Sequence, residues 1–275
     1  MTKHHTPSDD PNLVSLRFIT INDVYLPQRL AQFKTVVANQ ANDVDCQKVA
    51  LCGDFLGASP FAIHYKGESV VAVMNHLDLD YVVLGNHEFD FGTQNLIEQM
   101  ENAKFPLLGS NVFLNDKIDP VGPKSTKEKG GNFQKDDLLP GVIPHHSFTI
   151  KNKHNSSVKV GILGVCTDNT PSLSLPTKLV RFENPVEHAK IATKILKDEG
   201  CDVIIALTHV GLQQDKKIAE IADIDYILGG HEHTPMLLNH RGVTILKCGQ
   251  DADHVGIVNL KITKQFKSIL NQIPK

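Results

Sequence analysis

Five short segments of the sequence combine glycine, carboxylate, amide and imidazole groups, and each of them directly follows an apolar run. Carboxylate and amide oxygens together with imidazole nitrogens suit divalent ions such as Mn, Zn, Co or Fe. Glycines at such turns let the backbone bend sharply and bring side chains close together. The segments are Asn22-Asp23-Val24-Tyr25, Gly53-Asp54-Phe55-Leu56-Gly57, Gly85-Asn86-His87-Glu88-Phe89-Asp90-Phe91-Gly92, Thr208-His209-Val210-Gly211 and Gly229-Gly230-His231-Glu232-His233. They are candidate ligands of metal ions.

Each segment alone is weak evidence for a metal site. An Asp at the end of a strand is more often a turn or cap residue, and a lone histidine such as His209 is usually only hydrogen-bonded. The string Gly-Asn-His-Glu is different, because no turn or helix cap requires it. The five segments together favour a site in which one Asp carboxylate bridges two ions about 3.5–4 Å apart, the spacing that two-metal hydrolysis requires.

Short strands are the elements expected to position these segments. Apolar runs rich in Val and Ile recur along the chain, and runs this apolar are typical of strands buried on both faces. Ligands of open α/β sheets collect outside the carboxyl ends of the strands, where the five segments fall. The predicted strands cover residues 13–21, 48–52, 81–84, 158–165, 203–207, 226–228, 243–246 and 255–262.

Amphipathic helices are predicted between the strands. A helix is expected to start at Pro185, with Asn184 as its N-cap, and to end at Gly200. Strands that alternate with helices predict an α/β fold. The other predicted helices cover residues 28–40, 70–77 and 93–103.

Two regions near the chain's centre and end refine this fold. The runs 243–246 and 255–262 flank a polar turn and are expected to be neighbours in one sheet, which makes the sheets mixed rather than purely parallel. The stretch 114–146 holds four prolines and little periodicity, so we expect a long surface insertion there. The predicted organisation is one domain over residues 12–265, which contains the insertion at 114–146. Two tails flank the domain, at residues 1–11 and 266–275.

The overall composition excludes some classes of binding partner. The chain has 275 residues, 41% of them hydrophobic, and a formal net charge of −3. This near-neutral balance gives no reason to expect a nucleic acid or an anionic membrane as partner. No segment approaches the roughly 20 consecutive apolar residues of a membrane span. The polar start MTKHHTPSDDPN lacks the apolar stretch of a secretory signal, so we expect a cytoplasmic protein.

The combination of motifs resembles the calcineurin-like metallophosphoesterase superfamily. The pattern of that superfamily is D-x-H, G-D, G-N-H-E/D, a lone His and G-H-x-H. The longer string Gly-Asn-His-Glu-Phe-Asp-Phe-Gly is similar to the 5'-nucleotidase branch, as is the segment 105–111. The resemblance runs from about Leu16 to Leu260. It implies two mixed β-sheets packed face to face and flanked by helices, in four layers.

The resemblance also implies a role for each matching residue. One divalent ion would be held by Asp23, Asp54 and His233, and Asp54 would bridge it to a second ion. His87 would face the phosphoryl group as a cation, and Asp90 would orient it by a hydrogen bond. The remaining ligands of the second ion would be Asn86, His209 and His231.

Hydrolysis of a phosphate ester, in this branch a nucleotide, is the activity that the resemblance implies. Two ions, with Mn, Zn, Co or Fe as candidates, would lower the pKa of a bound water, and the resulting metal-bound hydroxide would attack phosphorus in line. His87 would stabilise charge on the phosphoryl oxygens. Asn111 is a candidate contact to the substrate.

Two features depart from the family pattern. The first motif usually has His two residues after the Asp, whereas this chain has Tyr25, and a phenol with an ordinary pKa of about 10 is a poorer ligand. Tyr25 is therefore a ligand of a strongly acidic metal such as ferric iron, a missing ligand, or only a neighbour of the site. The C-terminal domain that selects the nucleotide in full 5'-nucleotidases is expected to be absent, because the chain stops at Lys275.

Three functions remain open from the sequence. A nucleoside monophosphate phosphatase is favoured by the intact Gly-Asn-His-Glu-Phe-Asp string. A phosphodiesterase acting on 2',3'-cyclic or diphosphate-linked nucleotides would suit the open cleft that a missing clamp domain leaves. An inactive relative that binds metal or a partner protein would be consistent with Tyr25.

Overall fold

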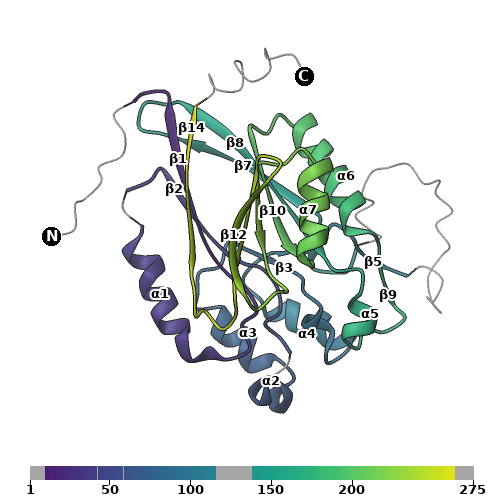
Figure 1. The fold of residues 1–275 in the computed structure, drawn as a ribbon. Coiled ribbons are helices and arrows are strands. Elements are labelled where there is room, and N and C mark those ends of the chain that lie inside the picture. Colours follow the sequence, from purple (N-terminus) through teal and green to yellow (C-terminus); the bar gives the residue numbers. More distant parts are fainter. Residues whose placement is uncertain (1–9, 42, 58, 116–137, 264–275) are drawn as a thin grey trace.

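Two six-stranded β-sheets packed face to face form the centre of the protein in the computed structural model (Figure 1). The structure describes residues 10–41, 43–57, 59–115 and 138–263. Helices cover the outer face of each sheet, so the described chain has four layers. This arrangement confirms both the α/β class and the layered architecture that the resemblance implies.

The first sheet leads into the first three candidate segments. Its strands, in sheet order, are β14 (Gly256–Thr263), β1 (Leu13–Ile21), β2 (Cys46–Leu51), β3 (Tyr81–Val83), β4 (Leu107–Leu108) and β6 (Val142–Ile143). All of them run parallel except β14, which pairs antiparallel with β1. Because parallel strands end at the same edge, the segments that follow β1, β2 and β3 meet there.

The second sheet leads into the two histidine segments. Its strands, in sheet order, are β12 (Pro235–His240), β13 (Val243–Cys248), β11 (Tyr226–Gly229), β10 (Val203–His209), β8 (Ser157–Cys166) and β7 (His145–Lys151). The four central strands are parallel, and the two edge strands are antiparallel to their neighbours. A small separate sheet pairs β5 (Val112–Leu114) with β9 (Val180–Phe182).

The contact between the two large sheets is a buried apolar core. Phe18 of the first sheet and Ile162 of the second belong to the same buried cluster. A Cβ at Gly164 would collide with the side chain of Leu108 in the opposite sheet, so glycine permits the close approach there. The N–H of Ser110 also donates to the carbonyl of Gly164 at 2.7 Å, which ties the sheets together near the site.

Helices form the outer two layers. The first sheet packs against α1 (Leu30–Asn39), α2 (Pro60–Tyr65), α3 (Glu68–Met74) and α4 (Thr93–Asn102). The second sheet packs against α6 (Pro185–Asp198) and α7 (Leu212–Ile221). Three short helices lie near the strand ends: η1 (Pro27–Arg29), η2 (His87–Phe89) and α5 (Thr170–Leu173).

The predicted start of α6 is confirmed in detail. The side chain of Asn184 accepts the N–H of Val186 at 2.9 Å and that of Glu187 at 3.2 Å, and Pro185 occupies the first turn. An N-cap satisfies backbone donors that have no partner inside the helix. Gly200 follows the helix with φ of 82°, a left-handed conformation that glycine adopts easily.

The predicted pairing of the last two strands is wrong. β13 pairs with β11 and β12 in the second sheet, whereas β14 crosses to the first sheet and pairs with β1. A polar turn between two apolar runs is compatible with a hairpin and with a crossing between stacked sheets, and local sequence does not separate the two. The sheets are mixed because of β7, β12 and β14 instead.

Part of the predicted surface insertion belongs to the fold. Leu139 is buried, and β6 pairs with β4, so residues 138–146 contribute to the first sheet and to the edge of the second. Residues 116–137 lie outside the described chain. None of the helices in the described ranges combines the length and apolarity that a membrane crossing needs.

Candidate metal centre

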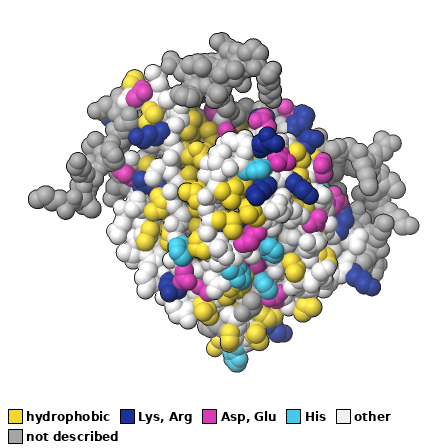
Figure 2. All heavy atoms as spheres, viewed as in Figure 1, with side chains coloured by type: hydrophobic (Ala, Val, Ile, Leu, Met, Phe, Trp, Pro, Cys, Tyr) yellow, Lys and Arg dark blue, Asp and Glu magenta, His cyan; other side chains and the backbone are white. Residues whose placement is uncertain are grey.

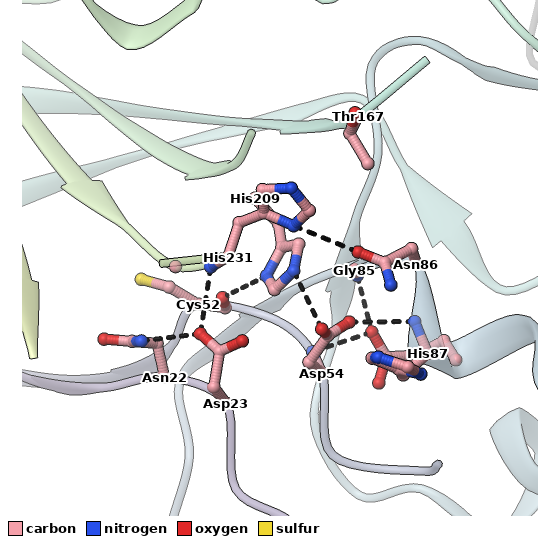
Figure 3. Close-up of polar contacts among 12 residues, drawn as sticks. Asn22, Asp23, Cys52, Asp54, Gly85, Asn86, His87, Thr167, His209 and His231 are labelled. Carbon is pink, nitrogen blue, oxygen red and sulfur yellow. Dashed lines mark hydrogen bonds and ion pairs between the residues drawn. The ribbon is translucent and has the colours of Figure 1, made fainter. Parts of the chain in front are cut away.

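The five candidate segments meet where β1, β2, β3, β10 and β11 end (Figure 3). Asp23 follows β1, Asp54 follows β2, and His209 is the last residue of β10. One ligand atom from each of these three residues lies within 4.8 Å of the others, and all three residues are buried. Residues far apart in sequence therefore converge into one cluster of metal-ligand types.

Asp54 lies at the centre of this cluster, with both carboxylate oxygens in use. Its Oδ1 accepts the backbone N–H of His87 at 2.9 Å. Its Oδ2 lies 3.0 Å from Nε2 of His209 and 3.1 Å from the hydroxyl of Tyr25. The turn gives Asp54 a φ of 58°, in the left-handed region that Asp adopts more readily than most residues. Oδ2 of Asp54 thus lies between His209 on one side and Tyr25 on the other.

Glu88, for which the sequence predicted no role, is a buried carboxylate that holds the turn around Asp54. Glu88 accepts the N–H of Asp54 at 2.9 Å and that of Phe55 at 2.7 Å, and it also accepts those of Gly85 and Leu56. Burial and the charge of Asp54 raise the pKa of Glu88 to about 7, although the backbone donors act in the opposite direction. Its position in the Gly-Asn-His-Glu string was the signal that could have found it.

His209 is fully buried, and a hydrogen bond to the backbone orients its ring. Nδ1 lies 2.7 Å from the carbonyl oxygen of Cys52. An Nδ1–H that donates to a carbonyl leaves Nε2 as the ligand atom, and this Nε2 points at Asp54. Nε2 makes no hydrogen bond of good geometry in the described chain, although it lies 3.0 Å from that carboxylate. A buried imidazole nitrogen held in this way suits a metal ligand.

His231 and Asn86 face each other beside Asp54. Nδ1 of His231 lies 3.1 Å from Oδ1 of Asn86, and the rings of His231 and His209 are 5.2 Å apart. Burial, together with the charge of His209, lowers the pKa of His231 to about 4, so this ring is neutral. Neutral imidazole is the form that binds a metal. We call Asn86, His209 and His231, with the shared Asp54, the inner half.

Asp23, Tyr25 and His233, with the same Asp54, form the outer half. The Tyr25 hydroxyl lies 3.2 Å from Oδ1 of Asp23 and 3.1 Å from Nε2 of His233. That nitrogen lies 3.3 Å from Asp23, and the His233 side chain is 49% exposed. The hydroxyl of Tyr25 therefore contacts all three residues predicted to hold the first ion, instead of packing beside them.

Opposite charges are concentrated at the centre of the site. Burial acts to raise the pKa of Asp54, but His209 and His87 together outweigh that effect and lower it to about 2. Burial would lower the pKa of His209, but the charges of Asp54 and Asp23 raise it to about 10. The pKa of Asp23 is raised, chiefly by burial. Without metal, the His209 imidazolium therefore supplies the positive charge that a divalent ion would replace.

The donor set fits a divalent cation. Carboxylate oxygens from Asp23 and Asp54, an amide oxygen from Asn86 and ring nitrogens converge on one region, and atoms of these types are the ligands that borderline divalent ions take. The pKa of Tyr25 is raised well above its ordinary value by burial and by both carboxylates, so its phenol stays neutral in the metal-free protein.

His87 and Asp90 form the predicted hydrogen bond. Nδ1 of His87 lies 2.7 Å from Oδ2 of Asp90, whose Oδ1 accepts the hydroxyl of Ser174 at 2.6 Å. The hydrogen bond that His87 donates to Asp90 raises the pKa of His87 to about 9, against the effect of burial. The His87 ring, 5.7 Å from that of Tyr25, is therefore a cation at neutral pH beside the metal ligands.

A second carboxylate without a predicted role, Asp251, holds the turn of the outer half. It accepts the N–H groups of Tyr25 and Leu26, each at 2.8 Å, and its own N–H donates to the carbonyl of Asp23 at 2.9 Å. No sequence motif marks Asp251, because its partners lie at the opposite end of the chain.

Asn111 does not contact the metal-ligand cluster through its side chain. It is fully buried, and its amide donates to the carbonyls of Cys166 at 2.7 Å and Glu183 at 2.8 Å. Its Oδ1 accepts the N–H of Cys166 at 2.9 Å. These bonds use both N–H donors to join β5, β8 and β9. The arrangement disfavours the substrate contact predicted for Asn111, because a structural role occupies the side chain.

Figure 2 shows histidine and acidic side chains gathered on the lower part of the viewed face, next to apolar ones. Exposed apolar side chains near Asp90 include Leu173 and Leu175, which flank Ser174. Charged groups that can bind an anion therefore lie close to surface that can contact an organic group.

The comparison with known proteins agrees with this geometry. A family model described as "Calcineurin-like phosphoesterase" matches residues 16–235. The chain belongs to the calcineurin-like phosphoesterase family. Divalent metal ions are the cofactors that this family implies, and Asp23, Asp54 and His209 form a candidate site for one.

Several 5'-nucleotidases are similar to this chain. Snake venom 5'-nucleotidase from Naja atra is 35% identical over 173 residues, which are 62% of this chain and 29% of that protein. NAD 5'-nucleotidase from Haemophilus influenzae is 32% identical over 183 residues, 66% of this chain and 26% of that protein. The chain thus spans less than a third of the length of these curated relatives.

A solved structure has the same fold. The structure of Haemophilus influenzae NAD nucleotidase superposes with a TM-score of 0.73 at 23% identity. The match covers 92% of this phosphoesterase and 48% of that chain. The two sheets and their flanking helices are therefore a fold that this chain shares with that solved structure.

Proposed function

We propose that this phosphoesterase releases phosphate from nucleoside monophosphates, as a 5'-nucleotidase does. The observation that carries the proposal is the convergence of Asp23, Asp54 and His209 within 4.8 Å, beside the His87–Asp90 pair. The names of the similar proteins support a nucleotide as substrate. The partner is then a small phosphate ester and not a nucleic acid.

Two divalent ions are the cofactors in this proposal, with Mn, Zn, Co or Fe as candidates. Bound there, they would neutralise a phosphate ester and lower the pKa of a water molecule. Asp54 would be shared between the ions. The other ligands would be Asp23 and His233 in the outer half and Asn86, His209 and His231 in the inner half.

His87 and Asp90 act on the phosphoryl group in this proposal. A His87 pKa of about 9 keeps the ring protonated at neutral pH, so it donates a hydrogen bond to a phosphoryl oxygen and stabilises charge that builds there. Asp90 fixes the ring through Nδ1, which leaves Nε2 for the substrate. Ser174 in turn orients Asp90.

The proposed catalytic unit spans residues 12–265. β1, near the N-terminal end of this unit, pairs with β14, near its C-terminal end, so both ends of the unit belong to the first sheet. Asp251, which precedes β14, contacts the turn that carries Asp23 and Tyr25.

Metal-dependent turnover tests the proposal. The chain with manganese should hydrolyse a nucleoside monophosphate and an aryl phosphate. Asp54→Asn should reduce the rate at least about 1,000-fold, and His87→Ala about 100- to 1,000-fold. Asn tolerates the left-handed conformation of Asp54, so this variant keeps the fold.

The matched control is Asp80→Asn. Asp80 pairs with Lys48 at 2.7 Å and precedes β3, whereas the candidate ligand Asn86 follows that strand, so the loss of the Asp80 charge should leave turnover unchanged. Absence of turnover with Mn, Zn, Co and Fe alike would contradict the proposal.

Diphosphate-linked nucleotides are a second candidate substrate class. The 32% identity to an NAD 5'-nucleotidase favours them. Rates on a nucleoside monophosphate, on NAD and on a 2',3'-cyclic nucleotide should be compared with the same enzyme preparation. Hydrolysis of the monoester alone would reject this second candidate.

A further inference from the structure

Lys247, on β13, is a buried lysine directly behind the metal ligands. Its side chain has no exposed surface. Nζ lies 2.7 Å from the carbonyl oxygen of Val210, 2.7 Å from that of Gly230 and 2.8 Å from Oδ2 of Asp215. A carboxylate oxygen of Glu232 is its fourth partner. One cation is therefore surrounded by four oxygens from three different parts of the chain.

Each partner of Lys247 in the two histidine segments is a covalent neighbour of a candidate ligand. Val210 follows His209 in the segment after β10. Gly230 precedes His231, and Glu232 lies between His231 and His233. The lysine thus joins the turn after β10 to the turn after β11. These turns present all three histidine ligands.

The two carboxylates extend this connection to α7. Asp215 is fully buried on α7, and its Oδ1 accepts the hydroxyl of Thr208 at 2.7 Å. Glu232 accepts the N–H of Leu212, the first residue of α7. Burial raises the pKa of Asp215 to about 6, whereas Lys247 acts in the opposite direction and favours the ionised form. Both turns are therefore fixed to one helix as well as to each other.

A purely structural role would not need charge here. The neighbouring Ile245 is fully buried and apolar, and a buried ion cluster is often no more stable than apolar side chains of similar volume. A cluster of charges does fix direction, because each oxygen must point at the ammonium group. A Cβ at Gly230 would collide with the carbonyl of Cys52, so the second turn is also pressed against the end of β2.

We propose that Lys247 is a positioning residue that sets the separation of His209 from His231 and His233 and thereby the coordination geometry of the metal centre. The inference rests on the proposed metal centre, but not on a particular substrate. Groups that orient metal ligands typically change metal affinity about 10- to 100-fold when they are removed. Lys247 differs from them in acting on the backbone beside three ligands at once.

Cobalt binding to the full chain tests this role. Lys247→Met should weaken Co²⁺ binding about 10- to 100-fold in calorimetric titration. It should also change the visible absorption spectrum of the bound Co²⁺, which reports coordination geometry. A lysine that only supports the fold would lower the melting temperature of the metal-free protein and leave that spectrum unchanged.

Two further variants keep the test decisive. Lys247→Met combined with Asp215→Asn and Glu232→Gln leaves no unpaired charge buried, and it should show the same altered spectrum if the single variant does not fold. Lys48→Met is the matched control, since Lys48 forms an ion pair with Asp80 at 2.7 Å away from both histidine turns. It should leave Co²⁺ affinity and spectrum unchanged.

The outcomes separate this inference from the proposed function. A folded variant without Lys247 that binds Co²⁺ with wild-type affinity and spectrum overturns the inference, even if the enzyme is active. An altered spectrum supports it, even if no phosphate ester is hydrolysed. Absence of Co²⁺ binding by the wild-type chain overturns the inference together with the metal centre.

Discussion

The inner and outer halves of the metal centre share Asp54 but are built differently. In the inner half, His209 is fully buried and fixed through Nδ1 to the carbonyl of Cys52. In the outer half, His233 is 49% exposed, and its Nε2 meets a phenol and a carboxylate. Ligands whose own orientation is fixed bind an ion with less loss of freedom. If two ions bind as proposed, the inner half should hold its ion more tightly.

The largest effect should come from removing one histidine from each half. His231→Ala should lose the tightly bound ion, with affinity reduced by more than the roughly 100-fold that loss of a supporting contact costs. His233→Ala should keep one tightly bound ion and lose the weaker one. Manganese content after dialysis against limiting Mn²⁺ measures both. Equal losses in the two variants would break the comparison between the halves.

A smaller effect is expected from the pair that lies outside both halves. The rate should fall as pH rises through about 9, because His87 acts as a cation and loses its proton there. In Asp90→Asn the hydrogen bond to a carboxylate is gone, so the His87 pKa should move toward its ordinary value of about 6.5. The alkaline fall in kcat/KM should then begin at lower pH, and the rate at pH 8 should drop about 10-fold or more.

Ser174→Ala is the matched control for this pH effect. It removes the hydroxyl that donates to Asp90 but keeps the carboxylate, so the pH profile should shift only slightly. A profile of Asp90→Asn that coincides with the wild-type profile would show that Asp90 does not set the protonation of His87.

The smallest expected effect is a gain in the affinity of the outer half for its ion. Tyr25→His replaces a neutral phenol by an imidazole at a position that contacts Asp23 and Asp54. The affinity of the weaker ion should rise about 10-fold, since imidazole is the better ligand for these metals. Calorimetric titration with Mn²⁺ measures it. Tyr25→Phe keeps the ring without the hydroxyl, and a complete loss of the weaker ion in that variant would instead identify the phenol as a ligand.

The convergence of the candidate ligands could be predicted from sequence because each belongs to a short local string. Asp54 and His209 follow apolar runs directly, and such runs end at the same edge of a parallel sheet. The N-cap at Asn184 is equally local and was predicted for the same reason.

The residues that hold those ligands could not be predicted in this way. Asp251 and Lys247 contact groups that are distant in sequence, and neither belongs to a recognisable string. The crossing of β14 to the first sheet was missed for a related reason, because its partner β1 lies at the other end of the chain. Asn111 shows the reverse limit of a local string, since the side chain of a residue in a matching segment bonds to backbone groups of distant residues.

Anomalous diffraction from crystals soaked in manganese tests the central claim most directly. We predict two manganese peaks that share Asp54, with the stronger one among Asn86, His209 and His231 and the weaker one beside Asp23 and His233. No peak within coordination distance of Asp54, or a stronger peak in the outer half, would contradict it.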